Sequence, residues 1–250
     1  MNYFYEKSIG ALALSTAVLS GVFALPVATG AEGTGDLPTL TQDVPAVEQK
    51  KAEKEKEKQL KEFIEERKAQ EKNPGAVAGG FYKTISVPSF EQSTNYYCGP
   101  ATVKQVLHFF NKTSSSQGTY ASRLGTTTSG TDFSLVDNVL NSSQSENTFV
   151  YKDIGTYSNW GANIDLNLKN DFPTVLDLTI SPSNMPKYTI NISGHILNVS
   201  GSDSTKASPL IRLTDPFDQG NRSVTLGNVW HPHSGVYKAN AAHFRQAMIW

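Results

Sequence analysis

Apolar side chains between residues 98 and 172 recur mainly at helical spacing. The longest amphipathic segment is Cys98–Asn111, in which one face carries the i, i+3, i+4, i+7 pattern of a buried helix side: Val103, Val106, Leu107 and Phe110. The same spacing predicts three shorter helices, at 119–124, at 133–141 and before Pro173. A single strand is predicted in this half, at 149–154. This part of the chain is therefore expected to be mainly helical.

The C-terminal third changes to an alternation of apolar and polar residues, which is typical of strands with one buried face. Strands are predicted at 175–180, 195–200, 210–215 and 235–239, and a closing helix at 241–248. In this pattern His195 shares a strand face with two apolar residues, and Asp215 has the inward-facing parity of its own strand. Helices followed by strands predict an α+β fold with an antiparallel sheet.

The first 31 residues have the pattern of a secretory signal peptide. Lys7 precedes an uncharged, mostly apolar run at 9–25, and small residues at 29 and 31 suit cleavage before Glu32. A membrane anchor is the alternative, but the run is short for a bilayer span and is interrupted by polar residues. We therefore expect residues 1–31 to be removed and the protein to be secreted or displayed at the cell surface.

Residues 32–80 are expected to form a charged, partly helical spacer or pro-segment. The stretch 48–72 holds nine Lys or Arg and eight Glu in 25 residues, with few large apolar side chains. Oppositely charged residues at i, i+4 spacing favour a solvated helix, and we favour a plain linker over a stalk. The segment Asn73–Gly80 predicts a break. The folded domain is then 81–250.

The composition of this domain limits the classes of molecule that it is expected to bind. From Lys83 to Trp250 it has twelve Lys or Arg against eleven Asp or Glu, so its net charge is near zero. Such a balance gives no basis for nucleic-acid binding. A span of 170 residues is long enough for one well-filled core, and we expect a monomer.

Cys98 is the only cysteine, so the exported domain has no internal disulfide and its thiol needs another reason to be present. It opens the predicted helix, with Pro100 in the first turn, where outward-pointing backbone N–H groups and the helix dipole favour a thiolate. Gln92 lies six residues upstream and could direct its amide towards the same spot. The alternative is a small buried hydrophobic residue.

A thiol nucleophile needs a base and a group that orients it. Of the five histidines, His108 lies in the helix of Cys98 and cannot reach back, and a residue on the closing helix is expected to be structural: His243. His231 and His233 could form a metal pair, but no further ligand is evident. His195, at the start of a strand, is the candidate base, and Asp215 could accept its other N–H. Asn198 and Asp218 are alternatives for this third member.

Three motifs together resemble those of papain-like cysteine peptidases related to the double-glycine leader peptidases, in their stand-alone secreted branch. They are Gln92 with Cys98-Gly-Pro-Ala, Gly194-His195-Ile-Leu-Asn-Val-Ser-Gly, and Leu213-Thr-Asp215-Pro. The resemblance spans Phe81 to about Phe217 and implies a papain-like fold with N-terminal helices packed on a C-terminal antiparallel sheet. It also implies Cys98 as nucleophile, His195 as general base, Asp215 as the residue that orients the imidazole, and Gln92 as the completion of the oxyanion hole.

The expected function is thus that of a secreted bacterial cysteine peptidase with a peptide or protein substrate and no cofactor or metal. A cell-wall amidase or amide ligase with the same residues, or a non-catalytic surface module, are the alternatives, and association with the cell wall is left open. Because enzymes of the resembled family cut after paired glycines, Gly79-Gly80 could be a site of self-trimming, although we favour a flexible hinge there.

Overall fold

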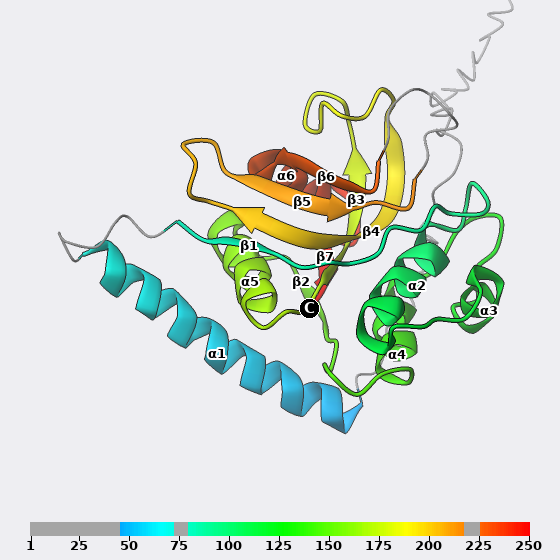
Figure 1. The fold of residues 1–250 in the computed structure, drawn as a ribbon, viewed down its shortest axis with the longest axis horizontal. Helices are drawn as coiled ribbons and strands as arrows, with labels where there is room; N and C mark the ends of the chain where they lie inside the picture. The colour runs from blue at the N-terminus through cyan, green and yellow to red at the C-terminus, as the bar shows by residue number, and fades with distance from the viewer. Residues whose placement is uncertain (1–45, 73–79, 218–225) are drawn as a thin grey trace, which may run out of the picture.

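The computed structural model describes residues 46–72, 80–217 and 226–250 (Figure 1). The predicted signal peptide at 1–31 lies outside these residues. Within them, no helix is both long and apolar enough to cross a lipid bilayer.

A seven-stranded sheet, in which each recorded pairing is antiparallel, forms the centre of the fold, with the order β2-β7-β3-β4-β5-β6 and with β1 paired to β4 (Figure 1). Its strands are β1 (Tyr82–Thr84), β2 (Tyr151–Asp153), β3 (Thr174–Ile180), β4 (Ile192–Asp203), β5 (Leu210–Thr214), β6 (Asn228–Pro232) and β7 (Ala247–Ile249). The first half of β4 pairs with β3, and its second half pairs with β5 and β1. The long strand β4 therefore connects both parts of the sheet.

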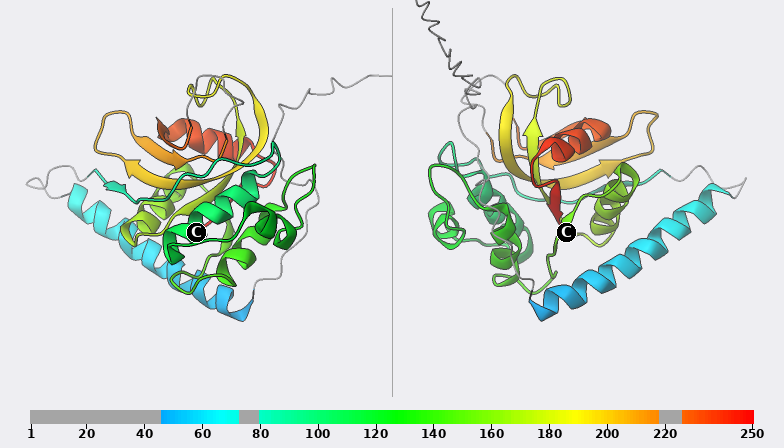
Figure 2. Two further views of the ribbon diagram at one scale, coloured as in Figure 1. Left: turned by 45° about the vertical axis from the view of Figure 1, so that its right-hand side comes forward. Right: turned by 180° about the vertical axis from the view of Figure 1, so that it is seen from behind.

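Six α-helices and one 3₁₀ turn surround this sheet in the described residues. They are α1 (Val47–Glu71), α2 (Cys98–Asn111), α3 (Gln117–Arg123), the 3₁₀ turn Phe133–Leu135, α4 (Val136–Asn141), α5 (Tyr157–Lys169) and α6 (His233–Ala242). Figure 2 shows α2, α3 and α4 as one group beside the sheet, and α2 packs directly against β4. This arrangement confirms the predicted α+β, papain-like fold with N-terminal helices packed on a C-terminal antiparallel sheet.

The two faces of the sheet belong to two separate apolar clusters, as the alternation of side chains along a strand requires. Ile196 joins the cluster that includes Cys98 and the buried face of α2, whereas Leu197 joins a larger cluster with α5 and α6. Val175 and Leu176 divide in the same way. The apolar cluster that includes Cys98 therefore packs the helices α2, α3 and α4 against the sheet.

The C-terminal end of the chain differs from the sequence prediction. The segment predicted as a strand at 235–239 is part of α6, whose buried residues include Val236, Ala239 and Asn240, a helical spacing. Gly235 is required there because a Cβ would meet the carbonyl oxygen of Asn184 at 1.9 Å. The predicted closing helix at 241–248 is also wrong, because the chain enters β7. Each residue of β7 is buried, so the alternation that marks a half-exposed strand is missing.

The charged segment before the domain is helical, as expected, but it does not behave as a plain linker. Leu60 and Phe63 of α1 are buried in the larger apolar cluster, and the ring of Phe63 meets the edge of Phe81 at 6.5 Å between centroids. Near its start, Gln49 donates to Asp137 of α4 at 2.9 Å, and near its end Arg67 pairs with α5. Buried apolar side chains and polar contacts near both ends thus dock the helix, and Figure 1 shows it running along the domain from α4 to α5.

Candidate active site

Cys98 occupies the first position of α2 and is fully buried. The preceding N-cap residue, Tyr97, provides no side-chain hydrogen bond to the helix end. Gly99 has to be small, because a Cβ there would lie 2.6–2.8 Å from the side chain of Thr131. The thiol thus lies at the positive end of a 14-residue helix, in a segment whose close packing fixes its position.

Two hydrogen bonds fix the level of α2 along β4. Thr102 Oγ1 donates to the carbonyl of Ile196 at 2.9 Å, and Asn198 Nδ2 donates to Gln105 Oε1 at 2.7 Å, so helix and strand run in the same direction. Four residues back from Thr102 is about 6 Å along a helix, which equals about two residues of strand. Cys98 is therefore level with the beginning of β4, where His195 stands.

His195 is fully buried and forms a short ion pair. Its Nε2 lies 2.6 Å from Oδ1 of Asp215, and the ring of Phe217 meets its edge at 5.5 Å. Nε2 is therefore committed to the carboxylate, and Nδ1 is the nitrogen left to serve a thiol. Within the described residues no other group bonds to Nδ1, and the interaction of the imidazole with the Cys98 thiol raises its pKa.

The pair is charged. Burial alone would lower the pKa of His195, but the charge and hydrogen bond of Asp215, with a smaller contribution from Cys98, raise it to about 10. For Asp215 the effects have the opposite sign: burial would raise the pKa of its carboxyl group, and the attraction of His195 lowers it below its usual value. An imidazolium and a carboxylate thus stabilise each other in the interior.

Asp215 directly follows β5 and is held by its own turn. Its backbone N–H donates to the carbonyl of Gly227, and the backbone N–H of Phe217 donates to Oδ1 at 2.7 Å. Oδ2 accepts a hydrogen bond from the hydroxyl of Tyr188. Of the alternatives for this position, Asn198 gives its amide to α2, and Asp218 lies outside the described residues.

A family model described as the Peptidase_C39 like family matches residues 84–239, which is more than half of the chain and includes α2, β4 and β5. The chain belongs to this family. No curated protein matches the chain significantly. Membership indicates a cysteine-peptidase-like function, which agrees with a lone buried cysteine beside a His–Asp ion pair.

In this member of the Peptidase_C39-like family, Gln92 lies in the loop before α2 and is tied to the turn of Asp215. Its backbone N–H donates to the carbonyl of Pro216 at 2.8 Å. Its side-chain amide donates to the carbonyl of Thr94 at 2.9 Å, which uses one of its two amide hydrogens. The loop therefore brings Gln92 to the same junction as Asp215, and its part in an oxyanion hole stays a prediction.

The remaining four histidines have other surroundings. His108 bonds with Ser114 at 3.1 Å in α2, and His243 lies 3.5 Å from Asp177. His231 stacks on Tyr188, whereas His233 bonds with the hydroxyl of Tyr157, so the two residues considered as a metal pair face different neighbours. Burial lowers the pKa of each of three of them to about 4: His231, His233 and His243.

Tyr188 is the residue at this site that the sequence analysis missed. It lies in the connection between β3 and β4, outside each motif considered, and it is almost fully buried. An isolated tyrosine in a loop gives no periodic signal, so only the folded structure shows that it reaches Asp215.

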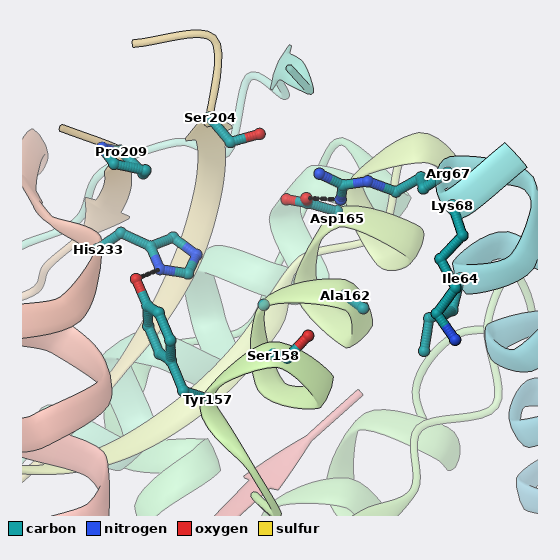
Figure 3. Close-up of a pocket in the computed structure, with 11 residues that line it drawn as sticks. Ile64, Arg67, Lys68, Tyr157, Ser158, Ala162, Asp165, Ser204, Pro209 and His233 are labelled. Carbon is teal, nitrogen blue, oxygen red and sulfur yellow. Dashed lines mark hydrogen bonds and ion pairs between the residues drawn. The ribbon is translucent and has the colours of Figure 1, made fainter. Parts of the chain in front are cut away.

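A separate cavity of about 320 Å³ lies between α1, α5 and the start of α6 (Figure 3). Its walls carry the His233–Tyr157 hydrogen bond and the Arg67–Asp165 ion pair, and Figure 3 shows these at opposite sides of the opening. None of the four predicted site residues lines it. We therefore treat this cavity as distinct from the candidate active site.

Proposed function

We propose that the protein is a secreted bacterial cysteine peptidase that hydrolyses peptide bonds with Cys98 as nucleophile and His195, Asp215 and Gln92 as its partners. The observation that supports this most strongly is the buried His195–Asp215 ion pair at the level of the Cys98 thiol. A charged imidazole in the interior is costly unless it is paired. Its position beside the only cysteine gives it a chemical use.

The first step is loss of the Cys98 thiol proton to solvent, because His195 already holds its own proton as an imidazolium. It leaves a thiolate at the N-terminus of α2, where backbone N–H groups stabilise negative charge. Asp215 keeps the ring oriented through Nε2 and stabilises the imidazolium. The result is a nucleophile and a proton donor held in the same buried junction.

The thiolate then attacks the carbonyl carbon of a peptide bond, and the electron pair of the C=O bond moves to oxygen. We assign the stabilisation of this oxyanion to the backbone N–H of Cys98 and to the side-chain amide of Gln92. A donor of this type contributes about 3 kcal/mol to the stability of the transition state. His195 gives its proton to the departing amine, and water releases the acyl group from sulfur.

The localisation follows from the sequence alone and is part of the proposal. A cleaved signal peptide would place the domain outside the cell, with α1 at the new N-terminal side of the domain. Because α1 is docked on the domain through Leu60 and Phe63, we propose that it stays part of the mature enzyme.

Self-trimming after Gly80 is not supported by the position of the cleavage point. The backbone N–H of Phe81 donates to the side-chain hydroxyl of Ser204, and the backbone N–H of Ser204 donates to the carbonyl of Phe81. Ser204 lies just beyond the end of β4, whereas His195 lies near the beginning of that strand. A Cβ on Gly80 would contact Thr205 at 2.4 Å, so this backbone is closely packed. Cleavage here would require β1 to leave the sheet and to travel to the opposite end of β4.

The test is a comparison of wild type, Cys98→Ala and His195→Gln on unfolded protein substrates, with purified cell wall and amine acceptors as parallel substrates. We expect loss of all hydrolysis in both variants and a single label from a thiol-directed epoxide in the wild type. Hydrolysis of cell wall in place of protein would favour an amidase. Full activity of Cys98→Ala would contradict the proposal, and absence of both labelling and activity in the wild type would favour a surface module.

A further inference from the structure

Tyr188 contacts Asp215 through the carboxylate oxygen that does not bind His195. Its side chain is 1% exposed, and its hydroxyl donates to Oδ2 of Asp215. The two carboxylate oxygens therefore have different donors: Oδ1 receives His195 and the backbone of Phe217, and Oδ2 receives the phenol. Removing the phenol would leave a buried, charged oxygen without this donor, which is costly.

The surroundings of the Tyr188 hydroxyl keep it protonated, so it remains a hydrogen-bond donor. Burial, and then the neighbouring charge of Asp215, raise the pKa of Tyr188 well above its ordinary value, so it keeps its proton over the working range of a peptidase. The backbone N–H of Tyr188 donates to the carbonyl of Met185 at 3.0 Å, which fixes the loop. The side chain thus has both a fixed position and a fixed protonation state.

A second ring holds the phenol in place. His231 of β6 is fully buried and stacks on Tyr188, with ring centroids 5.5 Å apart and planes inclined by 28°. Burial lowers the pKa of His231 to about 4, so at neutral pH this ring is uncharged. Asp215 and Lys187 are the charged groups that act on it: Asp215 opposes burial without overcoming it, and Lys187 lowers the pKa further. Because the imidazole of His231 that stacks on Tyr188 is uncharged, it does not compete with His195 for the charge of Asp215.

We propose that Tyr188 is a positioning residue of the proposed peptidase site, which holds the Asp215 carboxylate in the orientation that charges and aligns His195. The inference rests on the proposed function for its kinetic consequence. It does not rest on that function for the state of the ion pair, which can be measured without any turnover. The ring of His231 stacks on Tyr188 and keeps its hydroxyl directed at Oδ2.

The consequence for the imidazole follows from the hydrogen bond. Without the phenol the charged form of Asp215 is less stable, so the pKa of Asp215 rises. The carboxylate also loses the hydrogen bond that fixes its orientation towards His195, so it stabilises the imidazolium less and the pKa of His195 falls. In the peptidase, His195 must be protonated to donate to the leaving amine. The alkaline limb of kcat/KM in Tyr188→Phe should therefore move to lower pH, and the maximum should fall roughly 10-fold to 100-fold, the range for one hydrogen bond to a charged group.

The matched control is Tyr120→Phe. Tyr120 is also buried, 3% exposed, and its hydroxyl accepts the backbone N–H of Ser115 at 2.9 Å instead of donating to a carboxylate. This variant removes the same atom from the interior, so it reports the cost of losing a buried hydroxyl. We expect its pH profile to match the wild type. Equal losses in the two variants, with no movement of the alkaline limb, would overturn the positioning role.

A second measurement is independent of hydrolysis. Nuclear magnetic resonance titration of the His195 imidazole in wild type and in Tyr188→Phe should show a lower pKa in the variant, and an unchanged pKa would overturn the inference. If the wild type proves inactive but the titration shifts, the proposed function fails and the inference stands. Should Tyr188→Phe not fold, exchange of the Tyr188 hydroxyl proton in the wild type decides, because an unprotected proton contradicts the hydrogen bond.

Discussion

The described part of the chain includes two buried His–Asp pairs, and the pKa of the histidine is shifted in opposite directions in the two. His195 and Asp215 lie 2.6 Å apart, and the pKa of the histidine is raised to about 10. His243 and Asp177 lie 3.5 Å apart, and the pKa of this histidine is lowered to about 4. All four side chains are at most 1% exposed, so the degree of burial does not explain the difference.

The difference comes from distance and from the neighbouring charges. The 2.6 Å contact gives His195 a strong hydrogen bond to a carboxylate, and Cys98 adds to the stabilisation. At His243, burial is the main effect, and the cation Arg245 lowers the pKa further. Arg245 is itself bound to Asp132 at 2.8 Å, so it is fixed beside the ring. The same two residue types thus form a charged pair at one place and a contact with an uncharged histidine at the other.

The largest expected difference between the pairs is in catalysis. Asp215→Asn keeps the size of the side chain but removes the charge that stabilises the imidazolium, so we expect kcat/KM to fall roughly 100-fold to 10,000-fold. Asp177→Asn makes the same chemical change at the other pair. We expect activity per folded molecule to stay at the wild-type level there.

Both variants should be assayed with the folded fraction determined by active-site-independent means, such as near-ultraviolet circular dichroism. Equal activity losses at the two positions would show that the two pairs do not differ in function. Normal turnover in Asp215→Asn would remove Asp215 from the mechanism.

The pairs should also separate in the pH dependence of stability. His195 has a raised pKa, so its contribution is complete below the unfolded-state value of about 6.5 and is lost as pH rises through about 10. His243 has a lowered pKa, so the unfolded chain takes up its proton first, and stability is lost as pH falls from about 6.5 towards 4. His231 and His233 add to this acid side.

Urea unfolding between pH 4 and pH 10.5 measures the loss of stability on the acid side and on the alkaline side. His243→Asn should reduce the slope on the acid side alone, and Asp215→Asn should reduce the loss on the alkaline side. An acid slope that is unchanged in His243→Asn would contradict a neutral, buried His243.

Sequence pattern predicted the elements that bring the charged pair together. The apolar face of α2 and the alternation of residue types in β3, β4 and β5 are strong periodic signals, although β3 and β4 are buried on both faces. The parity of His195 and Asp215 in their strands then placed both on the same side. What the pattern could not give is the identity of the bonded nitrogen, which depends on distances of a few tenths of an ångström.

The His243–Asp177 pair could not be predicted in the same way, because it lies where the periodic signal fails. His243 follows α6, and α6 and β7 were predicted as a strand and a helix respectively. Both elements are buried by neighbours far away in the sequence, so their local patterns are ambiguous. Tyr188 is a similar case, because its role depends on a contact 27 positions along the chain.

The docking of α1 shows the same limit on a charged surface. Its sequence reads as a solvated helix, and most of its residues are exposed. The partners that hold it, Asp165 and Phe81, lie in other elements, and nothing in the local sequence points to them. Charge pattern predicted the helix, whereas tertiary contacts decided its place.

The smallest predicted effect tests on α1 whether the surroundings of an ion pair outweigh its mere presence. Arg67 pairs with Asp165 at 2.6 Å, and this carboxylate is 5% exposed, whereas the neighbouring Lys68 pairs with the exposed Glu65 at 2.9 Å. Arg67→Met leaves a buried carboxylate without its cation, and we expect a loss of about 2 kcal/mol in the free energy of unfolding. Lys68→Met breaks a pair that water already solvates, and we expect no measurable change. Equal losses in urea unfolding would mean that proximity of opposite charges alone, and not burial of the partner, determines the strength of these pairs.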